Sequence, residues 1–235
     1  GTFFVFSYYM KPAVRLAALM QLPVKYVWTH DAFRVGEDGP THQPVEQEAQ
    51  IRLLEHLRNH HGDRSMLVLR PADANETTVA WKMALENNST PTALILSRQG
   101  IENLPAANDN PYKTALKAER GAYIVKDPGG VPDVILVANG SEVSTLIDGA
   151  SLLEEKKKLK VRIVSAISEG LFRDQDEAYQ REILPPNIPT VGLTAGLPVT
   201  LSGLTGLKGK VIGMQSFGFS APYKVLDEKL GYTAE

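Results

Sequence analysis

Short apolar runs alternate with longer amphipathic stretches along the 235 residues of the chain. The short runs are rich in β-branched residues, which is typical of parallel strands buried on both faces. They are 24–28, 66–69, 92–97, 133–138, 160–165, 189–193 and 210–214. Helical periodicity marks 12–21, 44–60, 75–87, 142–158, 174–184 and 221–230. This alternation predicts βαβ units and three-layer α/β/α packing.

The segment 102–121 breaks this pattern, because it carries Pro, Asn and small residues with little periodicity at its start. We therefore predict two three-layer α/β units, residues 1–104 and 119–235, joined by a linker at 105–118. The first unit shows three clear strand patterns, fewer than a sheet usually has. The chain also opens on the aromatic-rich "GTFFVFSYY" without Met. We expect the N-terminal portion of this unit to be missing, or another chain to cover this end.

Composition narrows the functional classes. Apolar residues make up 43% and charged residues 22%, and the net charge of -2 gives no reason to expect nucleic acid or an anionic membrane as partner. Cysteine is absent, which excludes disulfides and a thiolate nucleophile and favours a cytoplasmic protein. No apolar run approaches the roughly 18 residues of a membrane span.

The sequence "GEDGPTHQP" at 36–44 predicts a stiff loop. Its glycines allow positive φ and its prolines fix φ and lack a donor, so regular structure is excluded there. Pro44 and the acidic residues after it are typical of a helix start. We expect the loop to end at a helix N-terminus and to project Asp38 and His42.

Polar side chains follow three of the predicted strands, namely His30, Arg70 and Arg98. In parallel sheets, ligands bind at the carboxyl ends of the strands. If these strands are parallel, His30, Asp38, His42 and Arg98 could share one rim. That rim would offer imidazoles for proton transfer, a carboxylate for hydroxyl groups and a guanidinium for phosphate. A strand cap, a turn and a surface ion pair remain the simpler alternatives for these residues.

Other patterns carry less information. Aromatic residues at 3, 6 and 9 repeat at i, i+3 and i+6, which by itself is typical of core packing. His30 and His42 lie too far apart for a metal-ligand motif, and "NHHG" at 59–62 resembles a helix C-terminus ending on Gly62. Walker, Rossmann and G-x-S-x-G motifs are absent.

Longer stretches resemble one family. "THDAFRVGEDGPTHQPVEQ" (29–47) closely resembles the signature loop of transketolases. The same order of motifs continues with "LRPAD" (69–73), "LILSRQ" (94–99), "VANGSEV" (137–143) and "IGMQSFGFSAP" (212–222). The resemblance covers essentially the whole chain.

The resemblance implies a thiamine-diphosphate enzyme that transfers a two-carbon ketol unit from a ketose phosphate to an aldose phosphate in the pentose phosphate pathway. This chain would be the latter part of the pyrimidine-binding domain plus the C-terminal domain. Mg²⁺ or Ca²⁺ would be held, with the diphosphate, by a first domain that is missing here. We expect the fragment to be inactive alone, and the whole enzyme to be a cytoplasmic homodimer with active sites between its subunits.

By position, the resemblance also implies roles for individual side chains. The aminopyrimidine of the cofactor would lie against Phe3, Phe6 and Tyr9. The sugar phosphate would be bound by His30 and Arg98, and its C2 hydroxyl by Asp38. His42 would bind the substrate near the reacting carbonyl and act as the catalytic imidazole.

Two departures from the family pattern bear on the substrate. Ala32, Phe33 and Arg34 replace the usual Ser, Ile and Gly, so that Arg34 could narrow the cleft or add a second phosphate contact. The segment 51–66 is longer than usual. Both put the chain length of the substrate in doubt. Two alternatives stay open: a related thiamine-diphosphate enzyme (a 2-oxoacid dehydrogenase β subunit or a deoxyxylulose-phosphate synthase), and a non-catalytic chain that regulates or assembles with a full-length enzyme.

Overall fold

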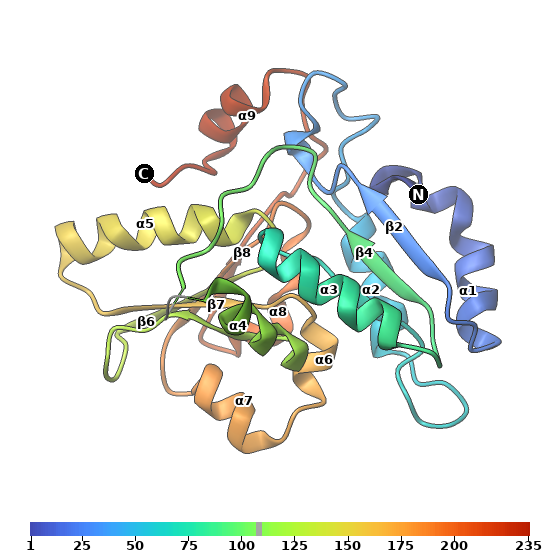
Figure 1. The fold of residues 1–235 in the computed structure, drawn as a ribbon. Coiled ribbons are helices and arrows are strands. Elements are labelled where there is room, and N and C mark those ends of the chain that lie inside the picture. The colour runs from blue at the N-terminus through green and yellow to red at the C-terminus, as the bar shows by residue number, and fades with distance from the viewer. Residues whose placement is uncertain (107–109) are drawn as a thin grey trace.

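The computed structural model describes residues 1–106 and 110–235, which form two α/β units packed against each other (Figure 1). The first unit has a parallel sheet of order β1-β2-β4-β3. Its strands are β1 (Thr2–Phe3), β2 (Lys25–Thr29), β3 (Leu67–Leu69) and β4 (Thr92–Ile95). Its helices are α1 (Lys11–Leu19), α2 (Gln47–His56) and α3 (Ala74–Glu86), with 3₁₀ turns η1 (Phe4–Met10) and η2 (Phe33–Val35).

The second unit has a mixed sheet of order β5-β7-β6-β8-β9, in which β5 runs antiparallel to β7. Its strands are β5 (Tyr123–Lys126), β6 (Val134–Ala138), β7 (Val161–Ser165), β8 (Thr190–Leu193) and β9 (Lys210–Ile212). Its helices are α4 (Pro111–Ala115), η3 (Leu116–Arg120), α5 (Glu142–Lys157), α6 (Glu169–Arg173), α7 (Glu177–Ile183), η4 (Pro198–Thr200), α8 (Ser202–Thr205) and α9 (Tyr223–Leu230).

Every strand and helix predicted from periodicity is present, with ends shifted by a few residues. The helix predicted at 44–60 is shorter, since it begins at Gln47 and ends at His56. The prediction of a helix end at Gly62 was therefore wrong: Gly62, with φ of +87°, lies in a turn closed by its own N–H on the Asn59 carbonyl.

The strands β1 and β5 and several short helices were not predicted. For β1, with two residues, and for α4, α6 and α8, with four or five, the element is too short to show a period. Of the predicted linker at 105–118, residues 107–109 lie outside the described part, and α4 and the start of η3 occupy its second half. The division of the chain at this segment stays a prediction.

The segment 51–66 runs from within α2 to the start of β3, so its last residues lie at the edge of the first sheet opposite the carboxyl ends of the strands (Figure 1). It contacts the second unit there. The Arg64 guanidinium pairs with Asp174 and donates to the Gly170 carbonyl, and Arg58 also pairs with Asp174. The segment therefore contributes to the contact between the units, on the side away from the strand ends where His30 and Arg98 lie.

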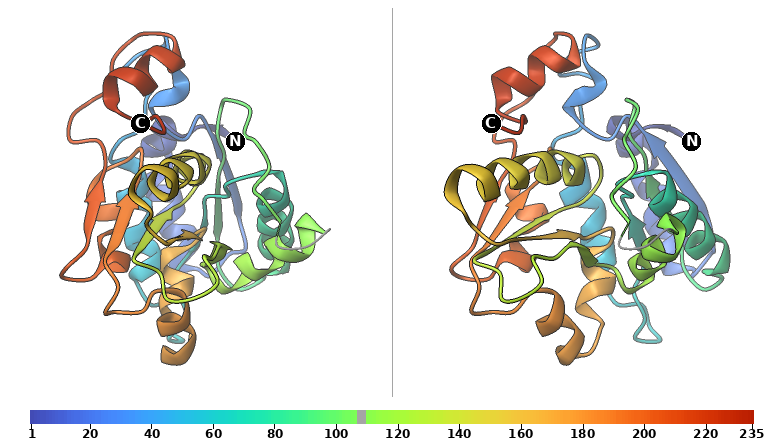
Figure 2. Two further views of the ribbon diagram at one scale, coloured as in Figure 1. Left: turned by 90° about the vertical axis from the view of Figure 1, so that its left-hand side faces the viewer. Right: turned by 60° about the vertical axis from the view of Figure 1, so that its left-hand side comes forward.

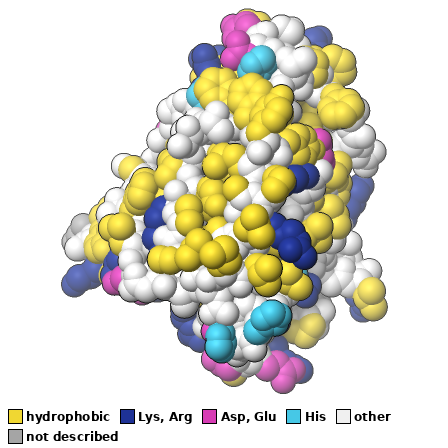
Figure 3. Space-filling model, turned by 90° about the vertical axis from the view of Figure 1, so that its right-hand side faces the viewer, with side chains coloured by type: hydrophobic (Ala, Val, Ile, Leu, Met, Phe, Trp, Pro, Cys, Tyr) yellow, Lys and Arg dark blue, Asp and Glu magenta, His cyan; other side chains and the backbone are white. Residues whose placement is uncertain are grey.

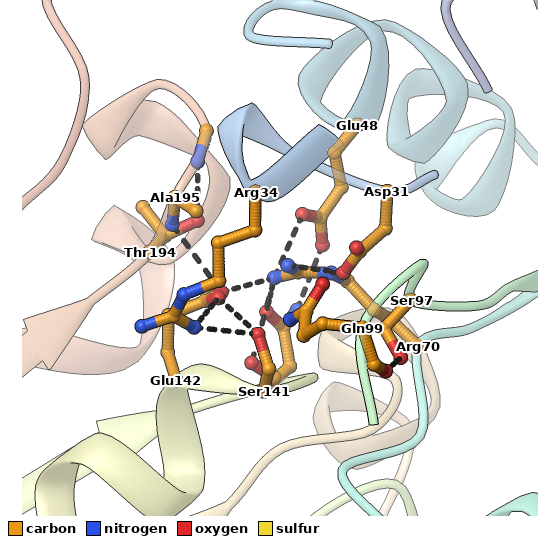
Figure 4. Close-up of polar contacts among 12 residues, drawn as sticks. Asp31, Arg34, Glu48, Arg70, Ser97, Gln99, Ser141, Glu142, Thr194 and Ala195 are labelled. Atoms are coloured by element: carbon orange, nitrogen blue, oxygen red, sulfur yellow. Dashed lines mark hydrogen bonds and ion pairs between the residues drawn. The ribbon is translucent and has the colours of Figure 1, made fainter. Parts of the chain in front are cut away.

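A second contact between the two units is a buried ionic cluster at the carboxyl end of β3, centred on Arg70 (Figure 4). Arg70 is 1% exposed; its Nη2 lies 2.6 Å from an Asp31 oxygen and its Nη1 lies 2.5 Å from Glu142 of α5. The same Nη1 donates to the Asn139 side-chain oxygen at 2.7 Å. Asn139 in turn donates to Glu48 of α2. Removing one member of such a buried cluster leaves an uncompensated charge, a change that typically costs about 3–5 kcal/mol.

A second buried contact between the units involves Glu76 of α3. Tyr123 of β5 donates its hydroxyl to Glu76 at 3.0 Å, and the Ala72 N–H donates to the other carboxyl oxygen at 2.8 Å. Burial raises the pKa of Glu76 from 4.5 to about 7. The folded protein therefore keeps this carboxyl protonated over a pH range in which the unfolded chain has lost the proton.

The pH dependence of the free energy of unfolding should include a contribution from Glu76. Because the folded state binds the extra proton, the contribution of Glu76 falls as pH rises from about 4.5 to about 7, by up to about 1.4 kcal/mol per pH unit. Glu76→Gln should flatten this slope in urea unfolding followed across that window. Glu177→Gln, on the exposed surface of α7, is the matched control and should leave the slope unchanged. An unaltered slope in Glu76→Gln would show that the group does not bind its proton as proposed.

Candidate active site at the carboxyl edge of the first sheet

The parallel register brings three strand ends to one edge of the first sheet. Trp28 of β2 pairs with Ile95 of β4, and Leu69 of β3 pairs with Leu94 of β4. The residues directly after these strands therefore lie along one rim, as the sequence predicted on the condition that the strands are parallel. They separate into two groups. Arg70 and Asp73 turn toward the domain contact and the start of α3, while His30 turns toward the N-terminal aromatic residues.

His30 stacks on Phe3, with ring centroids 3.6 Å apart and planes 13° apart. Phe3 belongs to β1, whose register sets it beside Thr29 of β2. His30 has φ of +61°, a left-handed conformation that is uncommon for a residue other than Gly. Its Nδ1 hydrogen-bonds with the Thr29 hydroxyl at 2.9 Å. Backbone strain of this kind gathers at functional sites, where the surroundings hold it in place.

His42 approaches the same aromatic group from the loop. Its ring lies edge-on to Phe6, with centroids 5.4 Å apart, and to Phe3 at 6.2 Å. Phe3 and Phe6 stack at 6.1 Å, and Tyr9 follows Phe6 at 6.2 Å. We call Phe3, Phe6 and Tyr9 the aromatic wall. The structure thus brings both imidazoles to one wall, although they are twelve residues apart in sequence.

The geometry of η1 explains the spacing of the wall. A 3₁₀ helix has three residues per turn, so residues three apart lie one above the other. The simpler alternative, a core role, applies instead to Phe4, which is fully buried beside Trp28. Tyr9 is 84% exposed, and Phe3 and Phe6 are half-buried. The wall therefore presents ring surface to whatever occupies the space beside it.

Asp38 and Arg98 lie close enough to His30 to act on its charge. Burial and the positive charge of Arg98 lower the pKa of His30, against the opposing pull of Asp38 and Asp31. Asp38 and Arg98 are themselves exposed. A neutral imidazole flanked by an exposed carboxylate and an exposed guanidinium can accept or donate a proton and can contact hydroxyl and phosphate groups.

Both ends of the loop 36–44 contact the C-terminal unit. Gln43, which is 2% exposed, donates from Nε2 to the carbonyls of Gly36 and Phe219, both at 2.9 Å. A pocket of about 390 Å³ opens between this loop and the wall. It is lined by Val5, Phe6, Tyr8, Tyr9, Pro40, Thr41, Gln43, Glu46, Gln47 and Phe217. The sequence did not single out Gln43 or Phe217 for this pocket, and only their places inside recognised motifs set them apart.

Arg34 does not line this rim. Its guanidinium is buried and donates to Asp227 of α9 at 2.7 Å, to Ser141 at 2.8 Å and to Thr145 of α5 at 3.3 Å. The expectation that Arg34 narrows the cleft or adds a phosphate contact was therefore wrong, because the side chain faces the C-terminal unit. Figure 2 shows the consequence: α9 packs beside the segment that contains η2, just before the loop.

Two absences concern the described residues, 1–106 and 110–235. Across these residues, no group of three or more His, Asp or Glu side chains lies close enough together to hold a metal ion. Over the same ranges, no helix is both long and apolar enough to cross a membrane.

Comparison with known proteins identifies the family. Residues 1–103 match the family described as "Transketolase, pyrimidine binding domain", and residues 121–233 match "Transketolase-like TK C-terminal domain". The chain belongs to the transketolase family. The transketolase of Bacillus subtilis is 43% identical over 99% of this chain, and that of Aquifex aeolicus is 42% identical over all of it. The chain spans about a third of the length of these relatives, 33% and 32% respectively.

Solved structures agree with this assignment. A Pichia stipitis transketolase in complex with xylulose 5-phosphate superposes with a TM-score of 0.86 at 33% identity, over 100% of this chain and 32% of that one. A split-gene transketolase, described as an inactive β4 tetramer, covers 99% of this chain and 71% of its own. Its TM-score is 0.74 at 23% identity, which shows a shared fold.

The grouping of Asp38 and Arg98 around His30 can be tested by titrating the His30 imidazole. Arg98→Gln removes a positive charge that lowers the pKa of His30, so that pKa should rise; Asp38→Asn removes an opposing charge and should lower it. NMR pH titration of the imidazole signals measures both shifts. Arg181→Gln, on remote α7, should leave His30 unchanged. If neither Arg98→Gln nor Asp38→Asn shifted the titration, these side chains would not face His30.

Proposed function

We propose that this chain is the pyrimidine-binding and C-terminal part of a transketolase, which transfers a two-carbon ketol unit from a ketose phosphate to an aldose phosphate. One observation carries the proposal: His30, His42, Asp38 and Arg98 gather beside the aromatic wall at the carboxyl edge of one parallel sheet. The family assignment supports it, as do the sugar phosphates named for transketolases of Pichia stipitis, namely xylulose 5-phosphate, sedoheptulose 7-phosphate and fructose 6-phosphate.

The residues present fit thiamine diphosphate in its pyrimidine part. Phe6 and Tyr9, which line the pocket beside the loop, offer ring surface to a planar heterocycle. We assign the aromatic wall to the aminopyrimidine. When bound, the cofactor supplies the carbanion chemistry that breaks and forms the carbon–carbon bond. Its diphosphate, with Mg²⁺ or Ca²⁺, would be held by a domain other than the two described.

The side chains of this chain then have separate tasks. Arg98 and His30 bind the phosphate end of the sugar, for which the guanidinium has the fitting charge and hydrogen-bond geometry. Asp38 accepts a hydrogen bond from the C2 hydroxyl of the aldose phosphate and so favours one configuration at that carbon. His42, half-buried against Phe6, moves a proton at the oxygen of the reacting carbonyl and orients the neighbouring hydroxyl.

An open apolar face supports an assembly between subunits. Figure 3 shows apolar side chains gathered over the face that contains the N-terminal segment and α1. Tyr9, Leu16, Leu19 and Met20 are all more than half exposed. Large exposed apolar patches mark interaction sites. We propose that this face is covered in a homodimer in which two subunits complete each active site, and that the enzyme works in the cytoplasm in the pentose phosphate pathway.

Arg98→Ala in the complete enzyme tests the phosphate assignment. Losing a charge-assisted contact of about 1.5–3 kcal/mol should raise KM for a phosphorylated ketose donor about 10- to 100-fold. KM for a non-phosphorylated donor such as hydroxypyruvate should hardly change. Steady-state kinetics with both donors measures the difference. An equal rise for both would remove Arg98 from the phosphate site.

A second candidate function is a non-catalytic chain that assembles with or regulates a full-length transketolase, favoured by the same exposed apolar face. The two proposals give different results on mixing. With thiamine diphosphate and magnesium, the 235-residue chain alone should turn over no ketose donor. Adding a separately expressed N-terminal part of a transketolase, which includes the diphosphate-binding domain, should restore turnover, and His42→Ala should abolish the restored rate. Restored turnover that survives His42→Ala would favour the non-catalytic role, and turnover by the chain alone would contradict both.

A further inference from the structure

We propose that the C-terminal domain positions the loop 36–44 for the reaction, through Ser220 and the backbone of Phe219, with Gln43 as the link on the loop side. The inference rests on the proposed function, because it assigns a purpose to holding Asp38 and His42 in place. It adds positioning residues from the C-terminal domain, which also contributes Phe217 to the pocket beside the loop.

The contacts are specific hydrogen bonds to the loop backbone. Ser220 donates its hydroxyl to the Glu37 carbonyl at 2.6 Å, directly before Asp38. Gln43 follows His42 and donates its amide to Gly36 within the loop and to Phe219 outside it, both at 2.9 Å. The loop is therefore tied at two points to one strip of the C-terminal domain, residues 219–220: its Glu37 carbonyl accepts from Ser220, and its Gln43 side chain donates to Phe219.

The surfaces also fit closely. A Cβ at Gly218 would overlap Gln43 Oε1, so the Gln43 amide would have to move. A Cβ at Gly39 would lie 3.2 Å from the Ser220 Cβ, and Gly39 already has φ of +74°. The loop and the C-terminal domain thus approach each other closely at these two glycines. A shift of either would lose the hydrogen bonds or create a clash.

The loop needs such support because its own structure is sparse. Within the loop, the Gly39 N–H donates to Gly36 and the His42 N–H donates to Gly39. Its glycines have wide conformational freedom, so ordering them costs more entropy than ordering other residues. Contacts from outside reduce the number of conformations that compete with the one in which His42 meets Phe6.

The strip is anchored in its own domain. It lies between β9 and α9, and α9 is tied by Asp227 to Arg34, two residues before the loop begins. The C-terminal domain therefore holds the loop at its entry, through Arg34, and along its length, through Phe219 and Ser220. Arg34 is one of the departures from the usual family pattern, and this arrangement gives it a role.

Ser220→Ala tests the proposal most directly, since Ser220 is exposed and its loss leaves the core intact. Gln43→Glu is the second variant: it keeps the side-chain shape but turns a carboxyl oxygen toward two carbonyl oxygens. Ser202→Ala is the matched control, because Ser202 also donates its hydroxyl to a backbone carbonyl, that of Val199, within the C-terminal domain. All are compared in the complete enzyme.

Two measurements are made on each variant. Hydrogen–deuterium exchange of the amides in 36–44 should be about fivefold faster in Ser220→Ala, the change expected for one lost hydrogen bond, and faster still in Gln43→Glu. The kcat/KM for the ketose donor should fall by a similar factor in Ser220→Ala while its urea midpoint stays unchanged. Ser202→Ala should change neither quantity.

The outcomes separate this inference from the proposed function. Unchanged exchange in both variants, or faster exchange with unaltered kcat/KM, would overturn the positioning role. Asp38→Ala serves as the reference for the function itself. If Asp38→Ala lowers kcat/KM and Ser220→Ala does not, the positioning role fails and the function stands. If Asp38→Ala has no effect, the proposed function fails, and faster exchange in Ser220→Ala would then report a structural contact alone.

Discussion

The site depends on a buried charge, the guanidinium of Arg70. It lies at the end of β3 and binds Asp31, which directly follows His30, together with Glu142 and Asn139 of the other domain. Burying a guanidinium costs several kcal/mol unless its partners are well placed, so the cluster tolerates few relative positions of the two domains. The strand ends that carry the site are held by the same contacts that join the domains.

The loop 36–44 is anchored on both sides by this arrangement. Arg34 before it pairs with Asp227, and Glu48 after it accepts from Arg52 and Asn139. Although burial opposes it, the charges of Arg70 and Arg52 lower the pKa of Glu48, which keeps this carboxylate ionised within the cluster. A loop rich in glycine and proline can carry substrate groups accurately when its ends and its middle are held in this way.

Unlike the buried ionic cluster, the aromatic wall is partly exposed to solvent. Phe3 and Phe6 pack against the two histidines on one side, while Tyr9 stays exposed on the other. Because one side of the wall is covered and the other is exposed, stacking on a bound heterocycle explains these rings better than a role in the hydrophobic core. The exposed apolar residues of α1 lie on the same part of the molecule (Figure 3). Cofactor site and subunit contact would therefore be neighbours, which fits an active site completed by a second subunit.

The sequence by itself determined the class of fold, the position of the loop and the strand ends that carry His30 and Arg98. These follow from local rules: apolar periodicity, the φ preferences of Gly and Pro, and the placement of His30 and Arg98 after parallel strands. The family motifs then narrowed the chemistry. What these rules cannot give is the partner of a side chain far away in the chain. Arg70 and Arg34 looked like rim residues, yet both turn toward charges more than sixty residues away. The packing of the two domains decides whether an arginine contacts a ligand or a buried carboxylate. Removing a charge from water costs free energy, so the stable packing is one in which the buried charges are paired.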